Sequence, residues 1–168
     1  MIDNIAIENV LLEWANGLTG SVVIIEDQSK PRPTTPYISL KITTFIPVGY
    51  AGKEETAVPV DLVKFDYSTT YDILVSINFY RDGAFTNASK LRDGFDSISV
   101  IEGLESNGLF FISTSDIRDI PNVVKKKFEE RYQMDVSFYI RSASTETLEQ
   151  IKKIELTNEL DGSTEIIE

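Results

Sequence analysis

Residues 71–79 constrain the fold of this chain more than any other segment, because their side chains alternate between apolar and polar. Successive side chains of a β-strand point to opposite faces, so an apolar period of two predicts a strand with one buried face. Leu74 and Tyr80 fall on the other face and indicate that it is partly covered. The buried face is predicted to consist of Tyr71, Ile73, Val75, Ile77 and Phe79.

The same period recurs in three further predicted strands, residues 37–46, 63–67 and 132–140. In the first of these, Tyr37 and Phe45 fall at the ends of the outer face. Residues 22–25 and 109–112 are short continuous apolar runs, which predict strands that are covered on both faces. Residues 145–156 fit either a helix or a strand.

The N-terminal segment has the periodicity of an amphipathic helix. Asp3 or Asn4 can cap its start, and Gly17 and Gly20 are placed to end it. The apolar stripe of this helix consists of Ile7, Val10, Leu11, Trp14 and Leu18.

Two more helices are predicted further along the chain. The second follows the turn at residues 81–83, and Gly94 inside it indicates a close packing partner, because glycine is otherwise unfavourable in a helix. Pro121 suits the first turn of a short third helix, with Val124 and Phe128 on its inner face.

This order of elements predicts an α+β fold, a mostly antiparallel sheet with two main helices packed on one face. The length of 168 residues fits one domain. We expect a single domain over residues 1–156 and an acidic C-terminal tail over residues 157–168, since only acidic charges follow Lys153.

The residue types that are missing exclude most enzyme classes. Cysteine and histidine are absent, which removes thiolate and histidine metal sites and both Ser-His-Asp and Cys-His catalysis. The sequence also lacks a glycine-rich phosphate loop and a GxSxG motif. We therefore expect no enzymatic activity, no cofactor and no metal site. Asp116 and Asp119 leave a carboxylate-based metal enzyme open as an alternative, with helix capping as their simpler use.

The negative net charge of the chain argues against a protein that binds nucleic acid tightly. Sixteen basic and twenty-seven acidic side chains give a net charge of −11, which repels phosphate backbones. Contact with DNA is expected only as passage of DNA past the protein. No apolar run has the ~20 residues that a membrane span needs, and the N-terminus lacks the basic region of a signal peptide.

An interaction protein is the remaining class. Residues 47–59 are polar, include the consecutive charges Lys53, Glu54 and Glu55, and are predicted to form a long exposed hairpin tip that reaches a partner. Residues 33–36 match the PxxP pattern of adaptor ligands, although entry into a strand is the simpler use. The three lysines at 125–127 are predicted to form a solvated face.

Three parts of the chain together resemble the neck or tail-terminator proteins of long-tailed bacteriophages. They are Trp14 in the first helix, Lys30-Pro31-Arg32-Pro33 running through Pro36 into residues 37–40, and Phe128-Glu129-Glu130-Arg131 ahead of Asp135 and Val136. The resemblance implies a structural virion protein, assembled in the host cytoplasm, that forms a six-fold ring at the neck. Such a ring stops polymerisation of the tail tube and joins the tail to the head connector.

The implied partners are further copies of the chain in a homo-hexamer and the tail tube protein, with sheath and head-connector proteins as further candidates. Another tail-completion or head-closure protein of the same particle stays open as an alternative. We predict that the subunit contacts use Lys30, Pro31, Arg32, Pro33, Glu129, Glu130 and Arg131.

Overall fold

The computed structural model describes residues 3–26, 31–58, 62–124, 127–149, 154–157 and 164–167. The chain divides into two compact units. The first unit contains residues 1–49 and 70–142, and the second contains residues 50–69 and 143–168. The single domain over residues 1–156 with a tail over 157–168 stays a prediction.

Helix α1 (Asn4–Thr19) has the boundaries that its caps predict. The Asp3 carboxylate accepts hydrogen bonds from the backbone N–H groups of Ile5 and Ala6, at 3.0 and 3.2 Å. At the other end Gly20 adopts a left-handed conformation with φ 68°, and its N–H donates to the Asn16 carbonyl at 2.7 Å. Gly17 lies inside the helix and does not end it.

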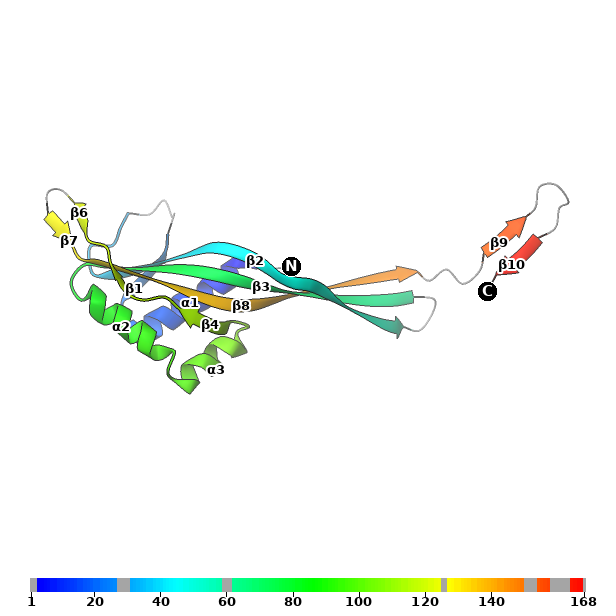
Figure 1. The fold of residues 1–168 in the computed structure, drawn as a ribbon, viewed down its shortest axis with the longest axis horizontal. Coiled ribbons are helices and arrows are strands. Elements are labelled where there is room, and N and C mark those ends of the chain that lie inside the picture. The colour runs from blue at the N-terminus through cyan, green and yellow to red at the C-terminus, as the bar shows by residue number, and fades with distance from the viewer. Residues whose placement is uncertain are drawn as a thin grey trace. The chain divides into compact units, whose positions relative to one another are not determined.

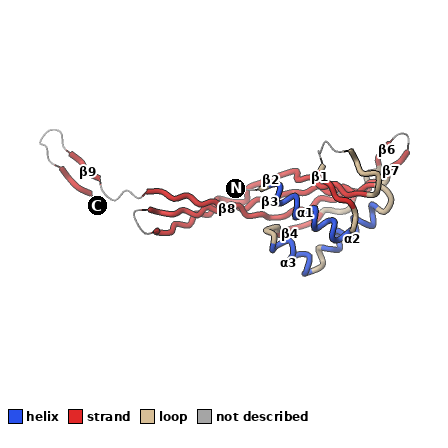
Figure 2. Tube along the Cα trace, turned by 180° about the vertical axis from the view of Figure 1, so that it is seen from behind, coloured by secondary structure: helices blue, strands red, loops and turns tan. Residues whose placement is uncertain are grey.

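The predicted second helix is divided in two, α2 (Ala84–Gly94) and α3 (Ile98–Ser106). A Cβ atom on Gly94 would lie 2.6 Å from Leu18 Cδ1 of α1, so the predicted close packing partner is confirmed. The three helices of the described residues lie on one side of the first unit's sheet (Figures 1 and 2). The predicted α+β fold with a mostly antiparallel sheet is confirmed, with three helices in place of two.

Six strands form one sheet, in the order β1-β2-β3-β8-β4, with β5 also paired to β8. The short edge strand β1 runs parallel to its neighbour, with Val22 opposite Tyr37 of β2. Strands β4 and β5 run antiparallel to β8. The strands are β1 (Val22–Ile25), β2 (Tyr37–Val58), β3 (Leu62–Tyr80), β4 (Phe110–Thr114), β5 (Arg118–Asp119) and β8 (Arg131–Glu149).

Two small hairpins complete the described strands. Antiparallel β6 (Asn122–Val124) and β7 (Lys127–Glu129) occupy the place of the predicted third helix, and Phe128 is 84% exposed. That prediction was wrong because a segment of about eight residues is too short to separate a period of two from one of 3.6. The second hairpin pairs β9 (Ile154–Thr157) with β10 (Thr164–Ile167).

The core of the first unit lies between the sheet and the helices. Four of the five side chains predicted for the buried face of residues 71–79 are fully buried, and Tyr71 is partly buried. An aromatic cluster of Trp14, Phe95, Phe111 and Phe138 joins α1 to strands β4 and β8. The largest fully buried side chains include Phe79, Phe138, Leu11, Ile38, Leu40, Ile73, Ile77, Leu91, Leu109 and Met134.

Three exposure predictions were wrong. Tyr37 is only 2% exposed, because residues distant in the sequence cover it. Val22 is 46% exposed because β1 is an edge strand, and Phe110 of β4 is 43% exposed. Residues 47–58 of the predicted exposed hairpin tip form the end of strand β2, and residues 47–49 and 51–56 are exposed as predicted.

Candidate functional site

A cluster of arginine and tyrosine side chains lies at the end of the first unit's sheet where β2 begins and β3 ends. The rings of Tyr37 and Tyr80 are stacked, with centroids 4.5 Å apart and planes 9° apart. Three guanidinium groups lie over them: Arg32 and Arg131 at 6.0 and 5.2 Å from the Tyr80 centroid, and Arg81 at 5.7 Å from that of Tyr37. We call these five residues the arginine–tyrosine cluster.

Arg81 has a left-handed backbone, with φ 71°, directly after β3. Such a conformation is strained for a residue with a Cβ atom, so neighbouring contacts must hold it. Its N–H donates to the Glu130 carbonyl at 2.8 Å, its Nε pairs with Glu129 Oε1 at 3.2 Å, and its Nη1 contacts the Thr35 carbonyl at 3.4 Å. Arg81 therefore joins the segment before β2 to the segment between β7 and β8.

Arg131 extends the cluster into a polar layer on one face of the sheet. Its Nη2 donates to Asn78 Oδ1 at 2.9 Å, and Gln133 Nε2 donates to Ser76 Oγ at 2.8 Å. These partners explain why Ser76 and Asn78 are buried although they are polar. Arg131 Nε is buried and has no hydrogen-bond partner among the described residues, as is also true of Glu129 Oε2.

Burial, and to a smaller extent the neighbouring Tyr80, raise the pKa of Tyr37 above its ordinary value of 10.0. Arg32 opposes this shift and lowers the pKa. The Tyr37 hydroxyl is therefore protonated at neutral pH and serves as a neutral stacking surface. The cluster is suited to binding through charge and aromatic contact.

The structure brings the two predicted contact segments together. Arg32 is exposed and Arg131 half-buried, and both lie over the same Tyr80 ring. The remaining predicted residues fall as follows: Pro31 is exposed, Pro33, Glu129 and Glu130 are half-buried, and Lys30 lies outside the described residues. Sequence reasoning missed Arg81, Tyr37 and Tyr80, which connect the segments.

The predicted partner-contact residues Lys53, Glu54 and Glu55 lie in the second unit. All three are exposed, as predicted, and lie on strand β2. Lys53 Nζ lies 3.9 Å from the ring centroid of Phe65 on β3. A contact of these residues with a partner stays a prediction.

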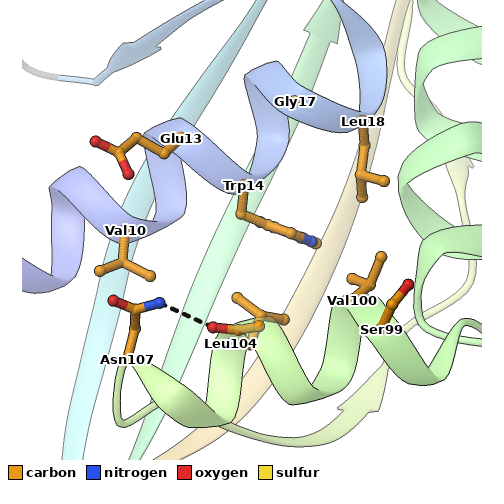
Figure 3. A pocket seen from close by; sticks show the side chains of 10 residues that line it. Val10, Glu13, Trp14, Gly17, Leu18, Ser99, Val100, Leu104 and Asn107 are labelled. Atoms are coloured by element: carbon orange, nitrogen blue, oxygen red, sulfur yellow. Dashed lines mark hydrogen bonds between the residues drawn. The ribbon is translucent and has the colours of Figure 1, made fainter.

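An apolar groove lies between α1 and α3 in the first unit, with a volume of about 270 Å³ (Figure 3). We call it the helical groove and define it by its apolar residues Val10, Trp14, Leu18, Val100 and Leu104. Trp14 Nε1–H is buried without a hydrogen-bond acceptor among the described residues. Sequence reasoning placed Val10, Trp14 and Leu18 on the apolar stripe of the first helix and did not find the groove.

The aspartates of the alternative enzyme hypothesis do not converge. Asp116 is almost fully exposed and lies 3.9 Å from Arg92 Nη2, while Asp119 is exposed on β5. Neither caps a helix, because strands follow them. Among the described residues no group of three or more acidic side chains is placed to hold a metal ion.

Comparison with known protein families identifies the family of this chain. A family model described as phage neck terminator protein matches residues 6–163, which is nearly the whole chain. The chain belongs to the phage neck terminator family. A search of curated proteins gave no match.

Membership in the neck terminator family indicates a structural component of the phage virion at the neck, in contact with other head and tail proteins. The resemblance drawn from Trp14, from residues 30–40 and from residues 128–131 ahead of Asp135 and Val136 is thereby confirmed. No helix within the described residues is long and apolar enough to span a membrane.

Proposed function

We propose that this neck terminator forms a closed ring of six copies, ends the tail tube and joins the tail to the head connector. The observation that carries the proposal is the family match over residues 6–163. Cyclic rings use two different surfaces of each subunit. The first unit offers two such surfaces, the arginine–tyrosine cluster and the helical groove.

The charge of the chain supports a ring through which DNA passes without being held. Six copies would carry −66, six times the −11 of one chain. A surface of that sign repels phosphates. We infer that the ring has no tight affinity for duplex DNA at physiological salt, and that its role is mechanical and not enzymatic.

We also propose where its contacts lie. Pro31–Pro33 and Glu129–Arg131 serve subunit contacts, since the arginine–tyrosine cluster presents them on one surface. Lys53, Glu54 and Glu55 contact a neighbouring protein of the particle, either the tail tube protein or a sheath or head-connector protein. Assembly takes place in the host cytoplasm.

The proposal is tested in particles produced with and without the gene. We expect a tag on the chain to appear in electron micrographs only at the junction of capsid and tail. Loss of the gene is expected to give tail tubes of uncontrolled length and heads without tails. A tag found elsewhere in the particle, or tubes of normal length joined to heads without the gene product, would refute it.

A further inference from the structure

Phe128 is the most exposed large apolar side chain among those described, at 84%. It lies on β7, and the three residues before it in the sequence are lysines. The two residues after it are fixed by Arg81, which pairs with Glu129 and donates to the Glu130 carbonyl. The fold therefore holds an aromatic side chain next to basic sequence in solvent, which costs free energy unless a partner covers it.

The helical groove is an apolar depression between two acidic helices, in contrast to the exposed Phe128 next to lysines. Its floor is apolar, and Glu13 lies on its lining. The two helices that form it contain four glutamates, Glu8, Glu13, Glu102 and Glu105, and no lysine or arginine. An apolar groove between acidic helices is complementary to an aromatic side chain that is accompanied by lysines.

Phe128 does not reach the groove of its own copy. The β6–β7 hairpin lies at one end of the first unit, and α3 lies well away from it in both views (Figures 1 and 2). Contact between the two surfaces therefore requires a second copy of the chain. Such a contact is head-to-tail, which is the type that closes into rings.

We propose that Phe128 of one copy inserts into the helical groove of the next copy. This inference rests on the proposed ring and names the surfaces that close it. Phe128 is then the central anchor of the contact, and the arginine–tyrosine cluster sets the position of the strand that carries it.

The first experiment replaces Phe128 with the photoreactive analogue benzoylphenylalanine, which keeps its aromatic character. Purified particles carrying this chain are irradiated, and the cross-linked peptides are identified by mass spectrometry. We expect a dimer of the chain in which position 128 is joined to α1 or α3. A dimer joined at any other segment, or a cross-link to a different protein, would overturn the proposal.

The second experiment fills the groove without disturbing the fold. A Cβ atom on Gly103 of α3 meets nothing within 4 Å, and leucine is more favourable than glycine in a helix. Gly103→Leu and Phe128→Ala are each expected to lower ring yield about tenfold or more. The matched control is Ile5→Ala, which removes an apolar side chain that is 69% exposed on α1 and lies outside the groove. Its ring yield should stay within about twofold of that of the unchanged chain.

The results also separate this inference from the proposed function. Rings that form at normal yield with Gly103→Leu or Phe128→Ala would overturn the contact and leave the ring intact. Particles in which copies of the chain never contact one another would refute the ring and this contact with it. Circular dichroism of each purified variant shows whether the fold is retained, and Phe128→Ala provides the decisive result if Gly103→Leu is misfolded.

Discussion

The two units of the chain are stabilised in different ways. The first unit buries a continuous set of apolar side chains, including Phe138, which is in ring contact with Trp14, Phe95 and Phe111. In the second unit every residue whose burial is described is exposed or half-buried. Its contacts include polar pairs. Tyr67 with Glu146 at 3.3 Å and Thr145 with Asp66 join β3 to β8, and Lys64 pairs with Asp66 at 2.8 Å within β3.

The two units therefore depend on different forces. Burial of apolar area contributes ~25 cal/mol per Å² and does not depend on charges that salt can screen. Exposed charge pairs contribute ~1 kcal/mol or less and are screened by salt. We therefore expect the first unit to resist denaturant, pH and salt over a range in which the second unit responds to them.

The largest expected effect comes from making the same substitution in each unit. Phe138→Ala leaves a cavity in the aromatic cluster and should destabilise the first unit by about 3–5 kcal/mol. Phe65→Ala removes a half-buried ring whose contacts are Lys53 and Tyr67, and should cost about 1 kcal/mol or less. Urea unfolding followed by the fluorescence of Trp14, the single tryptophan, measures the first unit, and equal shifts from both variants would contradict the comparison.

A smaller effect is expected at the arginine–tyrosine cluster. Arg81→Ala leaves the largely buried Glu129 carboxylate without its ion pair and should cost about 1–3 kcal/mol. Arg81→Gly removes the same pair but also relieves the strain at φ 71°, so it should be less destabilising by about 1 kcal/mol. The control is Arg92→Ala, whose ion pair with Asp116 is exposed at 3.9 Å, and it should change stability by about 0.5 kcal/mol or less.

If Arg81→Gly proves as destabilising as Arg81→Ala, the left-handed backbone carries no strain and the contacts alone matter. Thermal unfolding of the three variants side by side gives this result. A loss as large for Arg92→Ala would mean that burial of the pair is unimportant.

The smallest expected effect lies in the second unit. Hydrogen bonds from Lys64 and then Thr145 hold the pKa of Asp66 below its ordinary value of 3.8. A lowered carboxyl pKa contributes stability that is present above the ordinary pKa and is lost as pH falls through the folded one. Lys64→Ala should therefore raise the pKa of Asp66 in an NMR titration. The control is Lys53→Ala, which removes a lysine that makes no hydrogen bond to Asp66 and should leave this pKa unchanged.

The strands of the first unit were predictable because their pattern is local. Ile73, Val75, Ile77 and Phe79 alternate in the sequence, and all four are fully buried. The segment that begins at Pro121 was not predictable, since its few apolar residues fit two periods equally well. Nor was the burial of Tyr37, which depends on a ring 43 positions away in the sequence, that of Tyr80.

Two arginines of the candidate site were predictable from local sequence, but the tyrosines that join them were not. Charged and proline-rich sequence next to strands indicated Arg32 and Arg131. No local signal connects them with Tyr80, which lies under both, because only the pairing of β2, β3 and β8 brings these segments together. The helical groove was missed because a stripe that is apolar at helical spacing predicts burial and does not show where packing is incomplete.

Gly94 does not line the helical groove, but its lack of a side chain affects the shape of the groove through Leu18. Leu18, which would lie 2.6 Å from a Cβ at that position, also lines the helical groove. Any larger residue at position 94 would displace the Leu18 side chain and so change the shape of the groove. The shape of the helical groove therefore depends on Gly94, a buried residue of α2 that does not line it. A substitution at this buried position would change the groove without changing any exposed residue.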